Sequence, residues 1–256
     1  MTKLDLQPLL AVAIDAALDA AREILEVYAG EISVDQKRDQ SPVTLADARA
    51  EAVILRRLAA ASDIPIISEE QAEADGLPAS AAERFWLVDP LDGTKEFIKR
   101  NGEFTVNIAL IEQGRPILGV VGIPVRGLIY AAAGPGTAHR RNADGTLVPI
   151  EARVCPAEGA TVTSSRSHAT NDELDRLLET RKVADRKTAG SALKFCMVAE
   201  GAADLYPRMG PTMEWDTAAG HAVLEAAGGR MTRLDGTAFL FGKPGFLNPG
   251  FLAEGR

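Results

Sequence analysis

Residues 85–94 read Phe-Trp-Leu-Val-Asp-Pro-Leu-Asp-Gly-Thr. The apolar run over residues 85–88 predicts a buried strand, and the proline and glycine after it predict a tight turn. Asp89 and Asp92 flank this turn and can point into one space, where two unpaired carboxylates would repel each other. A hard divalent cation removes that repulsion, and Mg²⁺ prefers oxygen ligands. The stretch therefore predicts a metal-binding turn rather than an Asp-rich surface turn.

Other acidic residues follow predicted strands or begin predicted helices. Glu69 and Glu70 come directly after the apolar segment 64–67, and the carboxyl ends of strands commonly form sites in α/β proteins. Asp216 follows Trp215 at the start of a predicted helix. Each has a plain structural alternative, namely solvated glutamates at a strand end and a helix N-cap. Their positions make them candidates for the same site.

Periodicity of apolar residues gives the remaining elements. It predicts a long helix over residues 6–28 and a second helix from Thr44, where Asp47 completes a capping box. An antiparallel meander is expected over residues 104–140. The second half alternates strands and helices, with strands at 160–163 and 203–206 and helices at 171–181, 191–200 and 217–227. The pattern predicts one compact α/β unit with lobes at residues 1–154 and 155–256.

Composition narrows the class of protein. The 256 residues carry a formal net charge of −8, and 46% of them are hydrophobic. No apolar run reaches the ~20 residues of a membrane helix, and no signal peptide is recognisable, so we expect a cytoplasmic protein with at most peripheral membrane contact. Cys155 and Cys196 have no metal-binding spacing and are expected to be free thiols. The negative charge argues against a polynucleotide partner, and the oligomeric state stays open.

Two of these motifs resemble the signatures of a known family. Residues 89–94 and 215–220 are similar to the two signature motifs of the inositol monophosphatase superfamily, which includes fructose-1,6-bisphosphatases and bisphosphate nucleotidases. The order and spacing relative to Glu69 agree, and the resemblance covers roughly residues 10 to 235. It implies a layered α/β/α/β/α sandwich. Further segments resemble the 3'(2'),5'-bisphosphate nucleotidase branch, at residues 37–47, 95–97, 164–168, 190–196 and 206–216.

The resemblance implies a phosphatase that uses a metal-activated water. In this branch the reaction removes the 3'-phosphate of adenosine 3',5'-bisphosphate to give AMP. The implied cofactor is two or three Mg²⁺ ions, and the implied ligands are Glu69, Asp89, Asp92, Asp216 and the backbone carbonyl of Leu91. The catalytic residues it implies are Glu69, Thr94 and Asp39, with Thr94 orienting the water and Asp39 receiving its proton.

The substrate contacts are also implied by the resemblance. They comprise Glu69, Leu91, Asp92, Gly93, Thr94, Ser165, His168, Ser191, Lys194, Arg208 and Asp216. Lys194 and Arg208 supply the positive charge that a second phosphate needs. Read without the family, Lys194 is a solvated helix position and His168 a surface loop residue. Glu214 is expected to add negative charge near the nucleotide.

Two other functions remain open at this stage. One is an inositol or sugar phosphatase of the same superfamily, against which the basic residues between positions 165 and 208 argue. The other is a non-catalytic protein that senses a nucleotide or a metal. The sequence does not decide which bisphosphate is preferred, and it gives no evidence on lithium inhibition.

Overall fold

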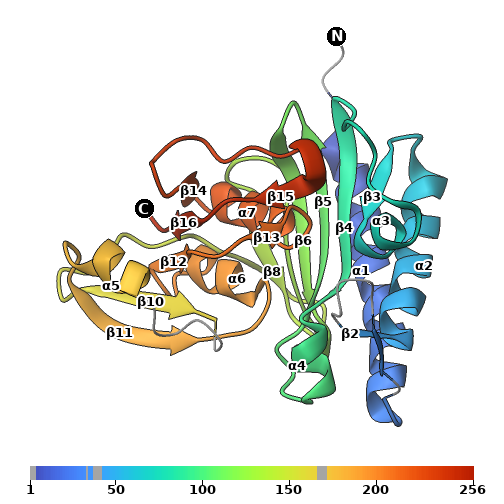
Figure 1. Cartoon of the computed structure of the whole chain (residues 1–256), viewed down its shortest axis with the longest axis horizontal. Coiled ribbons are helices and arrows are strands. Elements are labelled where there is room, and N and C mark those ends of the chain that lie inside the picture. The colour runs from blue at the N-terminus through green and yellow to red at the C-terminus, as the bar shows by residue number, and fades with distance from the viewer. Residues whose placement is uncertain (1–3, 33, 37–41, 166–171) are drawn as a thin grey trace.

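The computed structural model describes residues 4–32, 34–36, 42–165 and 172–256 (Figure 1). Helices and sheets alternate in five layers, with α1 (Leu6–Ala29) and α2 (Leu45–Ala61) outermost on one side. A seven-stranded sheet, the helix pair α6 (Leu193–Ala199) and α7 (Ala218–Ala226), and a five-stranded sheet follow. Helix α5 (Asp172–Leu178) covers the far face of the second sheet. The predicted α/β/α/β/α sandwich is confirmed.

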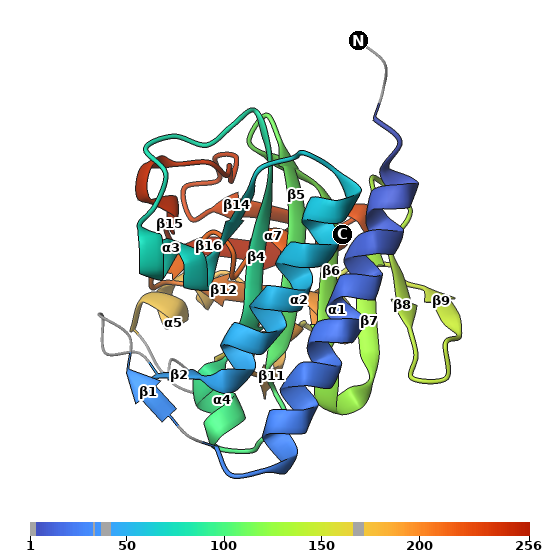
Figure 2. The same ribbon diagram turned by 90° about the vertical axis from the view of Figure 1, so that its right-hand side faces the viewer.

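The outer helices form where apolar periodicity and caps coincide. Asp5 caps α1, accepting a hydrogen bond from the Gln7 amide. The buried face of α1 is mostly alanine, which lets α1 and α2 pack closely side by side across the first sheet (Figure 2). Thr44 and Asp47 form the predicted capping box at the start of α2. Both predicted helices are confirmed to within about a residue at these ends.

The seven-stranded sheet has the order β3-β4-β5-β6-β7-β8-β9. Strands β3 and β4 are parallel, and every later neighbour pairs antiparallel. The predicted meander is confirmed as β5 to β8, and positive φ angles at Gln113 and Gly114 make its first tight turn. The strands span Ile66–Ser68, Arg84–Asp92, Thr105–Glu112, Arg115–Ile123, Leu128–Ala132, His139–Arg141 and Leu147–Pro149.

The five-stranded sheet has the order β11-β10-β12-β16-β14. Helix α7 packs on β5 and β6 of the first sheet and contacts β14 of the second, so it joins the two sheets. The predicted helix at 191–200 forms as α6, while the strand expected at 203–206 begins two residues later as β12. The strands span Ala160–Ser164 (β10), Val183–Thr188 (β11), Leu205–Arg208 (β12), Arg230–Arg233 (β14) and Phe251–Glu254 (β16).

Short elements complete the fold. They are β1 (Val34–Gln36), β2 (Pro42–Thr44), α3 (Glu69–Asp75), α4 (Thr94–Ile98), β13 (Thr212–Met213) and β15 (Leu247–Asn248), with 3₁₀ turns at Pro124–Arg126 and Pro244–Phe246. Strands β1 and β2 pair with each other, as do β13 and β15. Within the described residues, no helix is both long and apolar enough to cross a lipid bilayer.

Candidate active site

A one-residue bulge in β4 places Asp89 and Asp92 on the same side of the first sheet. Asp89 pairs with Asn107 of β5, and Asp92 pairs with Thr105. The two aspartates are three residues apart on β4, but their partners are only two residues apart on β5. In a regular strand, residues three apart face opposite sides, and an extra bulged residue reverses that relation. The bulge lies at Pro90-Leu91, where proline has no N–H to offer the ladder. The metal-binding turn expected from the sequence is thus a bulged strand end.

Three donors hold the Asp92 carboxylate in place, and all three reach the same oxygen. The Ala192 amide donates to Oδ2 at 2.7 Å, and the Asn107 amide group and the Thr105 hydroxyl each donate at 3.3 Å. Oδ1 of Asp92 accepts no hydrogen bond from the part of the chain that the structure describes. The β5 side chains and the start of α6 therefore fix Asp92 while leaving one oxygen for a ligand.

Asp216 enters the same site from the turn before α7. Its Oδ2 accepts from the Met213 amide at 2.9 Å, and its Oδ1 has no partner among the described residues. Desolvation, then the charges of Asp92 and Glu69, raise the pKa of Asp216 well above its usual value. Desolvation also raises the pKa of Asp92 to about 6, with Lys194 opposing the rise and Glu69 adding to it. Glu69, Asp92 and Asp216 therefore interact electrostatically.

These acidic groups have the donor chemistry of a hard divalent cation. They offer carboxylate oxygens, and Oδ1 of Asp92 and Oδ1 of Asp216 accept no hydrogen bond from the described residues. A cation would relieve the repulsion between these groups. In the described residues no three His, Cys, Asp or Glu side chains converge tightly enough to count as a ready metal cluster. The acidic side chains therefore fit a divalent ion by their oxygen donors and their negative charge, and not by a preformed ligand geometry.

The Thr94 hydroxyl lies against the carboxylate of Asp47, for which the sequence predicted a capping box at the start of α2. Thr94 Oγ1 is 3.3 Å from Oδ1 of Asp47 and 3.4 Å from the carbonyl oxygen of Leu91. The other oxygen of Asp47 accepts from the amide and hydroxyl of Thr44, both at 2.7 Å. Asp47 is 1% exposed, so the cap holds it rigidly beside Thr94. Asp39, the partner expected for Thr94, lies outside the described residues.

A cavity of about 240 Å³ joins the acidic groups to the residues expected to bind substrate. Seven of the predicted substrate contacts line it: Asp92, Gly93, Ser165, Ser191, Lys194, Arg208 and Asp216. Leu91 and Thr94 are not among the residues that line it, and the Thr94 hydroxyl contacts the Leu91 carbonyl oxygen. Tyr206 and Thr212 also line the cavity and were not predicted. His168 lies outside the described residues, so its predicted contact is not described.

Lys194 is a buried cation on the wall of this cavity, not a solvated helix position. It is 3% exposed and donates to the carbonyl oxygens of Ser191 at 2.7 Å and Ala189 at 3.2 Å. Desolvation lowers its pKa to about 8, with the charge of Asp92 opposing the change. Its ammonium also lies 5.1 Å from the centre of the Tyr206 ring. Lys194 therefore brings positive charge within reach of an anion in the cavity.

Two polar atoms in the cavity wall are buried and have no hydrogen-bond partner in the described chain. They are Nε of Arg208 and Oγ of Ser165. Among the residues that the structure describes, the Arg208 guanidinium makes only a long hydrogen bond, 3.5 Å, to the Pro211 carbonyl oxygen. Leaving a buried polar group unsatisfied costs about 1–3 kcal/mol. An anionic ligand would satisfy both groups, because both can donate.

Gly93 is where the two halves of the site meet most closely. Its φ is +92°, and a Cβ there would lie 2.1 Å from Oγ of Ser191. That hydroxyl lies 2.8 Å from the carbonyl oxygen of Asp92 and 2.9 Å from that of Glu103, so its one proton lies between two acceptors. Ser191 thus ties the start of α6 to the end of β4, and only glycine fits between them.

We expect Gly93→Ala to lower the free energy of unfolding by about 1–3 kcal/mol through this clash, and to reduce catalytic activity, because Ser191 must move away from Asp92. Gly76→Ala is the matched control. Gly76 has a similar φ of +89° with nothing within 4 Å of the added Cβ, so it measures the backbone strain alone. Urea unfolding and rate measurements on both variants separate the effects. Equal losses in both would contradict a close contact at Gly93.

Glu214 faces away from the cavity, contrary to the expectation that it adds charge near a nucleotide. It is fully buried, and it accepts hydrogen bonds from the amides of Gly242 and Lys243 at 2.6 and 3.0 Å. It also forms an ion pair with the Lys243 ammonium at 2.5 Å. Glu214 therefore anchors the segment before β15 beneath the turn that carries Asp216.

Comparisons with known proteins agree with this arrangement. A model of the inositol monophosphatase family matches residues 5–254. CysQ of Salmonella typhimurium, named a 3'(2'),5'-bisphosphate nucleotidase, is 49% identical over 239 residues, covering 92% of this chain and 95% of the relative. CysQ of Buchnera aphidicola, with the same name, is 43% identical over 244 residues, covering 93% and 90%.

Solved structures share the whole fold. CysQ from Bacteroides thetaiotaomicron is 37% identical, with a TM-score of 0.79 over 99% of both chains. An inositol monophosphatase from Zymomonas mobilis is 25% identical, with a TM-score of 0.78 over 99% of this chain and 95% of that one. Sequence and structure therefore agree from one end of the chain to the other. This chain belongs to the inositol monophosphatase family.

Proposed function

We propose that this chain is a Mg²⁺-dependent phosphatase that removes the 3'-phosphate of adenosine 3',5'-bisphosphate, giving AMP and inorganic phosphate. Its family is one of metal-dependent phosphatases. The observation that carries the proposal is one cavity lined both by the carboxylates of Asp92 and Asp216 and by the cations of Lys194 and Arg208. A substrate with two phosphates can use both kinds of group, the carboxylates through bound ions for the reaction and the cations for binding. Curated relatives at 43–49% identity bear the nucleotidase name.

The groups proposed to hold Mg²⁺ are the acidic side chains of this site and one carbonyl, namely Glu69, Asp89, Asp92, Asp216 and the backbone oxygen of Leu91. Two or three bound ions would neutralise the phosphate and lower the pKa of a water molecule. Asp92 and Asp216 each keep an oxygen available, and the bulge in β4 turns Asp89 to the side that Asp92 faces. Hydrogen bonds to Oδ2 of Asp92 and to Oδ2 of Asp216 support this assignment, because they hold both carboxylates without using Oδ1.

Thr94 and Asp47 are proposed to handle the proton of the attacking water. The Thr94 hydroxyl, donating to Asp47, can accept a hydrogen bond from a water at the reacting phosphate. A proton then passes through the hydroxyl to the Asp47 carboxylate, as in general base catalysis. We propose Asp47 for this role in place of Asp39. Water attack needs no nucleophilic side chain. Cleavage of the phosphorus–oxygen bond releases the 3'-oxygen of the nucleoside, which takes up a proton from solvent to become the 3'-hydroxyl, and Asp47 returns its proton to solvent.

Lys194 and Arg208 are proposed to bind the 5'-phosphate. Arginine offers a planar fork of donors that matches two phosphate oxygens, and lysine offers a compact charge. Ser165, Ser191 and His168 are proposed to contact the rest of the nucleotide. The two cysteines are free, Cys155 exposed and Cys196 buried, which suits the cytoplasmic location that we propose.

Arg208→Ala should raise KM for adenosine 3',5'-bisphosphate by about 10- to 100-fold, because it removes charge-assisted hydrogen bonds worth about 1.5–3 kcal/mol. Cleavage of a substrate with a single phosphate should change far less, since that substrate does not reach Arg208. Steady-state kinetics on both substrates give the comparison. Arg126→Ala is the control, because Arg126 is exposed and makes no hydrogen bond or ion pair among the described residues. Equal losses on both substrates would contradict the role assigned to Arg208.

Phosphate release from a panel of substrates tests the proposed function. The panel is adenosine 3',5'-bisphosphate, its 2',5' isomer, sulfated adenylate with a 3'-phosphate, inositol 1-phosphate and fructose 1,6-bisphosphate, each with Mg²⁺. We expect the highest kcat/KM on a nucleoside bisphosphate. A clear preference for inositol or sugar phosphate would assign the chain to that branch of the family. No release from any of them would favour a non-catalytic sensor.

A further inference from the structure

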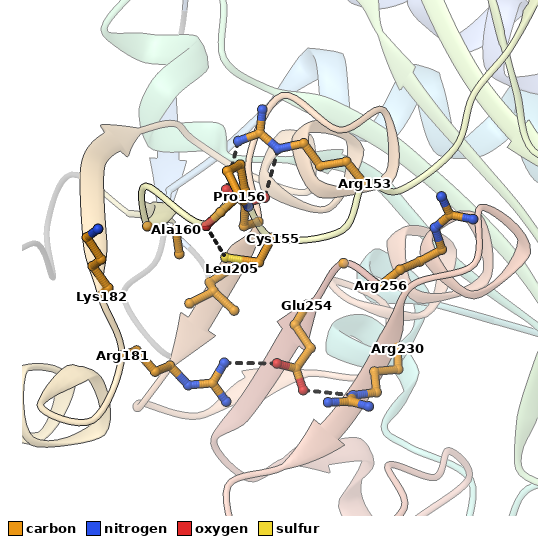
Figure 3. Close-up of a pocket in the computed structure, with 13 residues that line it drawn as sticks. Arg153, Cys155, Pro156, Ala160, Arg181, Lys182, Leu205, Arg230, Glu254 and Arg256 are labelled. Carbon is orange, nitrogen blue, oxygen red and sulfur yellow. Dashed lines mark hydrogen bonds and ion pairs between the residues drawn. The ribbon is translucent and has the colours of Figure 1, made fainter.

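A second cavity lies at the opposite ends of the two strands that lead into the active site. It has a volume of about 250 Å³, and Ala160 at the start of β10 and Leu205 at the start of β12 line it (Figure 3). The other ends of these strands supply Ser165 and Arg208 to the active-site cavity. The second cavity, which we call the basic pocket, is therefore separated from the active site by the length of two parallel strands.

The basic pocket carries an excess of positive charge in a chain whose net charge is −8. Its cationic lining residues are Arg153, Arg181, Lys182, Arg230 and Arg256. Internal ion pairs balance three of these charges, because Arg153 pairs with Asp204, Arg256 with Glu151, and Arg181 and Arg230 share Glu254. Within ion-pairing distance, the described residues therefore offer three side-chain carboxylates to five cations, two fewer than the cations need.

The shared carboxylate leaves most of its partners' donors available. Arg181 gives only one terminal nitrogen to Glu254, at 3.0 Å, and Arg230 gives only Nε, at 2.8 Å. Figure 3 shows the two guanidinium groups on either side of the Glu254 carboxylate. Since a guanidinium has five N–H donors, each arginine keeps donors for another acceptor. An anion with several oxygens can use donors from both.

Lys182 completes the donor set. Its ammonium contacts only the carbonyl oxygen of Ala157, at 3.2 Å, among the described residues. Apolar walls formed by Pro156, Ala160 and Leu205 lower the local polarity of the basic pocket, and charge interactions are stronger where water is partly excluded. Lys182, Arg181 and Arg230 therefore offer several N–H donors to the pocket, and Glu254 balances only one of their three positive charges.

We propose that the basic pocket binds a small doubly charged oxyanion of the phosphate or sulfate class. The two unbalanced cations match two negative charges, and the unused N–H groups of Arg181 and Arg230 match tetrahedral oxygens. The volume of about 250 Å³ is below the ~300–1,000 Å³ of sites for drug-sized ligands. A free ion or a compact phosphate ester thus fits better than a large cofactor. The proposal does not depend on the reaction at the active site.

Cys155 provides a local probe for this site. It lines the basic pocket and is exposed, whereas Cys196 is buried, so iodoacetamide should alkylate Cys155 in the folded protein. We expect inorganic phosphate or sulfate to slow this alkylation in a saturable manner, compared with chloride at equal ionic strength. Equilibrium dialysis with labelled phosphate counts the bound ions directly. Phosphate that binds at the active site does not shield Cys155.

The test variant is K182Q/R230Q, which removes two charges and leaves Glu254 paired with Arg181. It should lose protection of Cys155, bind one phosphate fewer per chain, or bind it at least about tenfold more weakly. The control is R22Q/R126Q, with the same change in charge. The control also removes one of two arginines that share a carboxylate. Asp19 loses its ion pair with Arg22 and keeps the one with Arg57, just as Glu254 in the test variant keeps its ion pair with Arg181. Alkylation rates independent of phosphate, together with equal phosphate stoichiometry in both variants, would overturn the proposal.

Discussion

Asp92→Asn will lower the rate of phosphate release by about a thousandfold or more, since the charge it supplies to the bound ions is worth several kcal/mol in the transition state. Asparagine has nearly the same shape, and its carbonyl oxygen can still accept from the Ala192 amide, as Oδ2 does now. The contacts to Asn107 and Thr105 also lie in reach of the new side chain. We therefore expect the fold to survive while the activity is lost.

Two further measurements on Asp92→Asn distinguish a lost ligand from a damaged fold. Calorimetric titration with Mg²⁺ should show weaker binding than in the parent protein, and thermal unfolding without Mg²⁺ should change little. Asp15→Asn is the matched control, because Asp15 is exposed on the outer helix α1 and lies 54 residues before Glu69 in the chain. Full activity and unchanged Mg²⁺ affinity in Asp92→Asn would reject Asp92 as a ligand.

Thr94→Val should reduce kcat by about 100- to 10,000-fold, the usual contribution of general acid–base catalysis. Valine keeps the shape of the side chain but removes the hydroxyl that contacts Asp47. Thr94→Ser, which keeps a hydroxyl, should restore most of the rate. Single-turnover kinetics with saturating Mg²⁺ isolate the chemical step. A Thr94→Val enzyme with normal kcat would contradict the proposed proton path.

Asp47 has a second task, capping α2, that must be separated from its proposed role in catalysis. Asp47→Asn removes the proposed proton acceptor, whereas Thr44→Ala removes the hydroxyl that contacts Asp47 at the cap. We expect Thr44→Ala to cost about 0.5–2 kcal/mol of stability with a nearly normal rate, and Asp47→Asn to slow the chemical step. The double variant T94V/D47N should be little slower than either single variant, since both interrupt one path.

Local patterns in the sequence predicted the strand and the helix cap that carry several residues of the candidate site. An apolar run ending in Asp-Pro-Leu-Asp-Gly-Thr predicted the strand and the acidic pair, and a threonine with an aspartate three residues on predicted the cap of α2. Lys194 was harder to interpret. Its position on a helix alone suggests exposure. In the folded chain it is buried, and its ammonium lies against the ring of Tyr206.

Features that depend on distant partners were not predictable from the sequence. The bulge in β4 exists only in register with β5, and the contact of Thr94 with Asp47 spans 47 residues. The orientation of Glu214 depends on Lys243, 29 residues later. Strand β11 was missed because its sequence is mostly polar and its residues are largely exposed at the edge of the sheet. Such non-local pairing leaves no periodic signal in the chain.

We propose that one cavity binds one phosphate of a nucleotide while the other phosphate is hydrolysed there. Phosphorus NMR of the product from adenosine 3',5'-bisphosphate with Mg²⁺ tests it most directly, because it reports which phosphate has left. We expect AMP that retains its 5'-phosphate, together with one equivalent of inorganic phosphate. Adenosine 3'-phosphate as the product, or an unchanged bisphosphate beside rapid hydrolysis of inositol 1-phosphate, would contradict the claim.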